Sequence, residues 1–324
     1  MEERLTCNQQ VEGSNPSRGF GYSETLLIMQ PMPPVKEVIK RVRRIELKTR
    51  GLVEGPVSGE YHSIFKGRGI EFAEVRGYIP GDDVRAIDWN VTARFNAPFV
   101  KEFIEERDLT LFIVFDVSSS NEFGFQRSKK DVCCDIAASL MFAALRNNDK
   151  VALCLFTSEV EKFIPPGKGK KHILKLLREL LYYEPKHKTT DIRTALAYLH
   201  NIIKKRSIIF IISDFLSPDF ELPLKQLKNK HDVILVDIED MREAHIPDIG
   251  YVFLEDQETG DQMLVDTSDP EFRERYTALV KDKRDDFLAR MKRIGVDIIQ
   301  INTVEPFHIP LQRFFKMRER RVRG

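Results

Sequence analysis

The feature that most constrains the fold is a regular alternation of short apolar runs and amphipathic stretches, which begins near residue 110. The apolar runs are rich in β-branched residues and occur at 111–115, 151–156, 207–212, 233–236 and 296–301. Stretches with helical periodicity separate them, at 128–147, 170–182, 191–205, 219–230 and 270–293. Buried strands that alternate with amphipathic helices are typical of a parallel sheet with helices on both faces. We therefore predict an α/β fold with a Rossmann-like, mostly parallel sheet.

Two segments depart from this alternation. "EVEKFI" (159–164) follows the run at 151–156 after only two residues, so we predict an antiparallel strand at the edge of the sheet. "YVFLEDQETGDQMLVD" (251–266) alternates on both sides of Thr259-Gly260, which predicts a hairpin that turns there.

The part before residue 109 has a different character. Residues 1–29 show no apolar periodicity, and we expect an extension that is either disordered or wrongly included by an over-extended gene assignment. For residues 30–108 we predict a basic amphipathic helix at about 35–50, followed by a small β-rich unit. We expect residues 109–305 to form the α/β domain. We expect residues 306–324 to be a basic C-terminal helix or tail.

Composition excludes several classes of protein. The net charge of +1 over 324 residues gives no general attraction to nucleic acid or to acidic lipid. The four cysteines are too few for a disulfide scaffold, and we expect Cys133, Cys134 and Cys154 to be small core residues in a reducing compartment. No apolar run approaches the roughly 20 residues of a membrane span. We therefore expect a cytoplasmic protein.

Oxygen-bearing side chains lie in three of the predicted loops, at the carboxyl ends of the strands. They are Asp116, Ser118 and Ser120 of "DVSSS", Thr189 and Thr190 of "KTTDIRTAL", and Asp214 of "ISDF". Ligands of open α/β sheets bind beyond the carboxyl ends of the strands, where such loops converge. A set of oxygens without histidine or thiolate suits Mg²⁺, Mn²⁺ or Ca²⁺. Each residue alone has a simpler explanation as a helix cap or a turn residue, but the whole set at these strand ends favours a metal site.

The three stretches together resemble the metal-ion-dependent adhesion site of von Willebrand factor type A domains. The resemblance implies that the metal ligands, direct or through water, are Asp116, Ser118, Ser120, Thr190 and Asp214. It also implies a von Willebrand A-like fold for the α/β domain. The family often has glycine after the last aspartate, where this chain has Phe215. We expect Phe215 and Phe123 to offer apolar contact next to the open site.

A second stretch, "EFAEVRGYIPGDDVRAIDW" (71–89), is similar to the bacterial domain of unknown function 58 family. Members of that family often occur beside MoxR-type AAA+ ATPases, which implies such an ATPase as a partner. Opposite charges are dense between residues 67 and 94. We interpret this region as an ion-paired β unit with Trp89 as its core plug, and the alternative is a surface that binds a partner or a second catalytic surface.

The enzyme alternatives find less support in the sequence. "PPGKGKKH" (165–172) lacks the pattern of a phosphate-binding loop. A magnesium-dependent phosphohydrolase with Asp116 as nucleophile is the main alternative, but such enzymes place a second acid two residues later, where Ser118 stands. We therefore predict a protein-binding module that is not an enzyme. Its metal would capture an aspartate or glutamate of a partner protein, with no role for nucleic acid.

Overall fold

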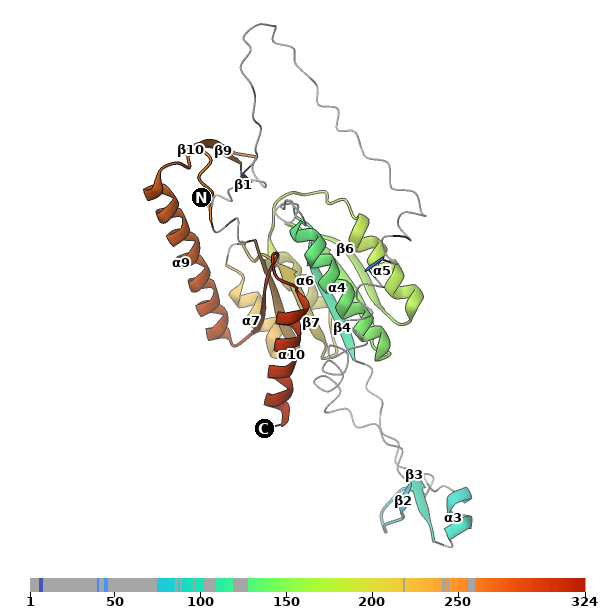
Figure 1. Ribbon diagram of the computed structural model, residues 1–324. Helices are drawn as coiled ribbons and strands as arrows, with labels where there is room; N and C mark the ends of the chain where they lie inside the picture. Colours follow the sequence, from blue (N-terminus) through green and yellow to red (C-terminus); the bar gives the residue numbers. More distant parts are fainter. Residues whose placement is uncertain are drawn as a thin grey trace.

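The central feature of the structure, a computed structural model, is a six-stranded sheet in the order β11-β8-β7-β4-β5-β6 (Figure 1). Every pair of neighbouring strands is parallel except β5 with β6. The strands are β4 (Thr110–Asp116), β5 (Lys150–Phe156), β6 (Val160–Gly167), β7 (Ile208–Ser213), β8 (Asp232–Glu239) and β11 (Asp297–Asn302). The predicted fold class is confirmed, including the antiparallel edge strand. The structure describes residues 6–7, 40, 44–45, 75–84, 87, 89–95, 97–101, 109–118, 128–217, 219–240, 243, 245–255 and 260–323.

Helices cover both faces of this sheet, because its strands are apolar on both sides. The helices around it are α4 (Lys129–Arg146), α5 (Lys170–Tyr182), α6 (Ile192–Ile202), α7 (Glu221–Lys230), α9 (Pro270–Ile294) and α10 (His308–Arg323). Leu111, Ile113 and Phe115 of β4 pack in one core with α4, α5 and α10. Phe112 and Val114 point the other way and pack with α6, α7 and α9. The basic segment at the C-terminus is therefore a helix whose apolar side completes the first of these cores.

The ends of the helices follow from local sequence. Asp191 caps α6 by accepting a hydrogen bond from the amide of Arg193, at 2.9 Å. Asp269 and Pro270 begin α9, and Gly295 ends it in a left-handed conformation with φ of 71°. These caps fix where α6 begins and where α9 begins and ends.

A smaller antiparallel sheet contains the predicted hairpin, now β9 (Tyr251–Glu255) and β10 (Gln262–Asp266). The short strand β1 (Thr6–Cys7) pairs with β9, and Thr6 is opposite Glu255. The hairpin follows β8 and precedes α9, so it leaves the main sheet at the carboxyl ends of the strands (Figure 1). The rest of the predicted extension at 1–29 lies outside the described residues. Of the helix predicted at 35–50, only Lys40, Arg44 and Ile45 are described, and all three are helical.

The charge-rich region contains β2 (Val75–Gly77), α3 (Trp89–Phe95) and β3 (Phe99–Lys101), and β2 pairs antiparallel with β3. Arg76 forms an ion pair with Asp82 at 2.6 Å, and this hydrogen-bonded guanidinium lowers the pKa of Asp82 to about 2. The prediction that Trp89 is a core plug is wrong. Trp89 begins α3, a helix with no buried residues, and its side chain is 67% exposed.

Candidate metal centre

The candidate site lies at the topological switch point of the sheet, where later strands are added on opposite sides of β4. From β4 the chain crosses to β5 on one side, whereas β7 pairs with the other side of β4. Asp116 is the last residue of β4, and Asp214 directly follows β7. Because the two strands are parallel neighbours, both carboxylates reach the same edge of the sheet. This is the position at which open α/β sheets bind their ligands.

Asp116 is buried and both of its carboxylate oxygens accept hydrogen bonds from nearby groups. The amide of Ser118 donates to Oδ1 at 2.9 Å, and the hydroxyl of Ser213 donates to Oδ2 at 2.7 Å. Burial raises the pKa of Asp116 to about 6, and the charge of Asp214 adds to the rise. The hydrogen bonds from Ser118 and Ser213 act in the opposite direction. The pair of aspartates therefore carries a like-charge repulsion that a bound cation would relieve.

Asp214 lies in a turn that several hydrogen bonds hold in place. Its Oδ1 accepts a hydrogen bond from the amide of Leu216 at 3.2 Å, and the amide of Phe215 donates to the hydroxyl of Ser213 at 3.1 Å. The same turn meets the start of α6, because the amide of Ile192 donates to the hydroxyl of Ser217 at 3.3 Å.

Thr190 comes to this edge from a third loop. The residue after it, Asp191, donates its amide hydrogen to the carbonyl of Thr157 at 3.0 Å, which fixes the loop against the end of β5. Thr190 itself is buried. The simpler explanation of Thr190 as the cap of α6 is wrong, because Asp191 is the capping residue. Asp116, Ser118, Thr190 and Asp214 are thus buried at one edge of the sheet, whereas Ser120 lies outside the described residues.

A buried lysine stands next to these acids, and the sequence analysis missed it. Lys129 is the first residue of α4 and its side chain is fully buried. Its Nζ lies 2.6 Å from Oε2 of Glu243 and 3.7 Å from Oδ2 of Asp214. Burial alone would lower the pKa of Lys129, but Glu243 and Asp214 raise it above its ordinary value. The lysine is therefore a permanent positive charge at the site.

Ser213, Lys129 and Glu243 had weak signals in the sequence. Ser213 stands in the quoted "ISDF", and the strand register places it beside the end of β4. Lys129 follows Ser128, so its place in the first turn of a helix was readable, but its burial was not. Glu243 is 114 positions away in the chain and carries no motif.

Phe215 departs from the prediction of an apolar residue at an open site. Its side chain is only 5% exposed, and its ring packs against Phe220 and Phe287 at centroid distances of 6.0 and 5.6 Å. Its φ of 55° is in the left-handed region. Glycine adopts that conformation without steric cost, whereas Phe215 depends on its ring packing. Phe123, the other residue of that prediction, lies outside the described residues.

The chemistry of the donor set fits a hard divalent cation. The described candidates offer two carboxylates and two hydroxyls, and only oxygen atoms. Cys133 is buried close to the site, where burial raises the pKa of its thiol well above the ordinary value, and a thiol is not a ligand that these hard cations prefer. Among the described residues, no three histidine, cysteine or carboxylate side chains are grouped to hold a metal by themselves. Hydroxyls and water would have to complete the coordination.

A second buried acid lies further along the same edge. Asp237, near the end of β8, is inaccessible to solvent and forms an ion pair with Arg284 of α9. Burial raises the pKa of Asp237 to about 7, although Arg284 lowers it, and Asp214 contributes to the rise. The electrostatic strain at this edge therefore extends beyond the candidate ligands.

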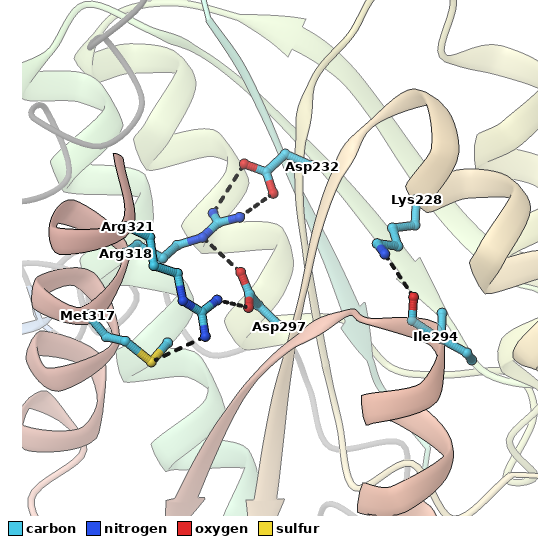
Figure 2. A network of polar contacts seen from close by, with 7 residues as sticks. All are labelled: Lys228, Asp232, Ile294, Asp297, Met317, Arg318 and Arg321. Carbon is cyan, nitrogen blue, oxygen red and sulfur yellow. Dashed lines mark hydrogen bonds and ion pairs between the residues drawn. The ribbon is translucent and has the colours of Figure 1, made fainter. Parts of the chain in front are cut away.

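At the amino ends of the strands, on the side of the sheet opposite the candidate site, acidic and basic side chains form ion pairs (Figure 2). Arg318 of α10 donates to both oxygens of Asp232 at 3.1 and 2.6 Å, and its Nε lies 2.8 Å from Asp297. Arg321 donates to Asp297 at 3.1 Å. Asp232 and Asp297 begin β8 and β11, so these contacts attach α10 to the amino ends of both strands.

Comparison with known proteins identifies the family. The family described as "Protein of unknown function DUF58" matches residues 74–286, well over half of the chain. The chain belongs to this family. "Uncharacterized protein Rv1480" from Mycobacterium tuberculosis is 29% identical over 283 residues, which are 86% of this chain and 89% of that protein.

Two solved structures show weaker similarity to this DUF58 protein. The protein BatB from Bacteroides thetaiotaomicron matches with a TM-score of 0.42 and 12% identity, over 65% of this chain and 99% of that one. The VWA domain of Rpn10 matches with a TM-score of 0.37 and 10% identity, over 63% and 93%. None of the helices in the described part of the chain is both long and apolar enough to cross a bilayer.

Proposed function

We propose that this DUF58 protein is a metal-dependent protein-binding module of the cytoplasm. One observation carries the proposal: two buried carboxylates, Asp116 and Asp214, share the switch-point edge of the sheet with the hydroxyl residues Ser118 and Thr190. These residues would hold the cation, and Ser120 would join them. Bound there, Mg²⁺, Mn²⁺ or Ca²⁺ supplies a positive charge to which a carboxylate of a partner can bind.

Binding is a better match to this site than catalysis. A carboxylate nucleophile needs an oxygen directed at its substrate. Both oxygens of Asp116 instead accept hydrogen bonds, from Ser118 and Ser213. These contacts orient the carboxylate as a fixed ligand, which supports the proposal that the protein has no hydrolytic activity.

The partner needs apolar contact as well as an acid, because both the acid and the metal lose water when they meet. The β9–β10 hairpin offers such contact, since Tyr251, Phe253 and Leu264 are exposed. Phe253 is directly opposite Leu264, and Tyr251 is on the same face as Phe253. We propose a partner that presents an aspartate or glutamate with apolar neighbours, and that this partner is a MoxR-type AAA+ ATPase.

Calorimetry with Mg²⁺ and Mn²⁺ tests the metal site. Asp116→Asn keeps the size of the side chain but removes its charge, and we expect metal binding to fall below detection. Asp191→Asn is the matched control. Asp191 adjoins Thr190, but it pairs with Arg193 and caps α6, and asparagine retains the cap. Equal metal affinity of the native protein and Asp116→Asn would refute the metal site.

Recovery of complexes from cells tests partner capture. We expect the native protein and Asp191→Asn to recover the AAA+ partner, and we expect Asp116→Asn or excess chelator to abolish recovery. Tyr251→Ser should weaken recovery but leave its metal dependence intact. The same complexes in every sample would overturn capture through the metal.

The phosphohydrolase is a second candidate because a fully buried lysine lies beside Asp214. A lysine next to a carboxylate can stabilise the charge of a phosphoryl group. Magnesium-dependent turnover of p-nitrophenyl phosphate, lost in Asp116→Asn, would favour this candidate over the binding module.

A further inference from the structure

Lys129 is a described feature of the site that a cation-binding function does not itself require. Lysine is almost never fully buried unless it is paired. Here the side chain is 1% exposed, and its ammonium contacts both Glu243 and Asp214. A divalent cation held by Asp214 would meet this positive charge in a region of low dielectric, where repulsion is strong.

Glu243 holds the ammonium at the closer distance, 2.6 Å against 3.7 Å for Asp214. The backbone of Glu243 is itself fixed at both sides. Its amide donates to the carbonyl of Asp240 at 3.0 Å, and its carbonyl accepts a hydrogen bond from the hydroxyl of Tyr276 at 2.9 Å. Glu243 is therefore a fixed anchor between the end of β8 and α9, and it draws the ammonium toward itself.

We propose that Lys129 is a tethered internal cation that competes with the metal for Asp214, and that Glu243 sets the outcome by holding the ammonium. This inference rests on the proposed function and adds a control on the same site. When Glu243 holds the lysine at the closer distance, the ammonium neutralises Asp214 only in part, and a metal can compete for this carboxylate. When Glu243 is lost or drawn away, the lysine neutralises Asp214 in place of the metal.

If Lys129 and the metal compete for Asp214, substitutions of Lys129 and of Glu243 should change the affinity for Mg²⁺ in opposite directions. Lys129→Met removes the charge but keeps an apolar stem, so Mg²⁺ should bind about tenfold more tightly or better. Glu243→Gln releases the ammonium toward Asp214, so Mg²⁺ should bind about tenfold more weakly. The double variant should resemble Lys129→Met, because Glu243 acts only through the lysine. A lysine with a purely structural role predicts no gain in affinity from its removal.

Calorimetry of Mg²⁺ binding to the full chain measures all of these effects. Lys130→Met, the next residue of α4, controls for the change in net charge and should bind Mg²⁺ like the native protein. If Lys129→Met folds only in the presence of Mg²⁺, its thermal midpoint should rise with Mg²⁺ more steeply than that of the native protein. Glu243→Gln tests the proposal independently, because its result does not depend on whether Lys129→Met folds.

The outcomes separate this inference from the proposed function. Tight binding by the native protein, with equal or weaker binding by Lys129→Met, would overturn the internal cation and leave the binding module in place. Binding by Lys129→Met alone would support the internal cation and overturn the metal site in the native chain. No binding by the native protein or by any variant would overturn both.

Discussion

At the amino end of the sheet Arg318 contacts both Asp232 and Asp297 (Figure 2), whereas at the carboxyl end Asp116 lies close to a second buried aspartate, Asp214. Both ends contain acids on neighbouring strands. The acids of the amino end are matched by arginines of α10. Those of the carboxyl end are more deeply buried, and this burial, with a smaller contribution from the charge of Asp214, raises the pKa of Asp116 to about 6.

The difference shows at which end of the sheet the fold retains unfavourable electrostatic interactions. Matched ion pairs at the amino end attach a helix to the sheet and stabilise the domain. Repulsion between buried acids at the carboxyl end reduces stability, and such a cost persists in folded proteins where it serves a function. Lys129 and Arg284 offset part of this cost by their ion pairs with Asp214 and Asp237.

The largest expected effect concerns the strained turn at the carboxyl end. Phe215→Ala should lower the free energy of unfolding by about 3–4 kcal/mol, because the ring leaves its contacts with Phe220 and Phe287. Phe215→Gly loses the same contacts but relieves the left-handed backbone, so it should be about 1 kcal/mol more stable than the alanine variant. Urea denaturation measures both. An alanine variant as stable as the glycine variant would show that the backbone is not strained.

The next effect concerns the ion pairs of the amino end. Arg318→Met should lower the free energy of unfolding by about 3 kcal/mol, because it leaves Asp232 without its guanidinium. Arg321→Met is the control. The side chain of Arg321 is 63% exposed against 16% for Arg318, so its loss should cost less than about 0.5 kcal/mol. Equal losses in denaturant titrations would mean that burial does not decide the strength of this network.

A smaller effect is a dependence of stability on pH at the carboxyl end. Because burial raises the pKa of Asp237 from 3.8 to about 7, the folded state binds the proton more tightly than the unfolded state. The resulting stabilisation is complete below the unfolded pKa and is lost as pH rises through about 7. Each pH unit in this window should lower the free energy of unfolding by up to about 1.4 kcal/mol. Asp237→Asn should remove this slope from denaturation curves recorded in chelator, and an unchanged slope would assign it to other groups.

Most of the architecture was predictable because it depends on local pattern. The parallel strands are buried on both faces, so "LFIVF" and "SIIFII" appear as continuous apolar runs. Strand ends then located Asp116 and Asp214, because the residue after a buried strand must reach the edge of the sheet. The alternation of residues in the hairpin was equally clear.

The remaining features depend on contacts between distant parts of the chain. Lys129 begins a helix in the manner of a solvated residue, and only its contacts with Glu243 and Asp214 explain its burial. Phe215 follows a site residue and was expected to be exposed, but Phe287 of α9 covers it. Trp89 was assigned to a core because tryptophan is usually well buried, and its position on α3 leaves it exposed.

The most direct test compares stability with and without metal in variants of the two ends. In urea titrations, about a hundredfold excess of Mg²⁺ over its Kd should raise the free energy of unfolding of the native protein by about 2.7 kcal/mol relative to chelator. Asp232→Asn should be less stable in both conditions but gain the same amount from Mg²⁺. Asp116→Asn should be more stable than the native protein in chelator and gain nothing from Mg²⁺. A native protein that is insensitive to Mg²⁺, or an Asp116→Asn variant that gains as much, would contradict the assignment of the carboxyl end as a cation site.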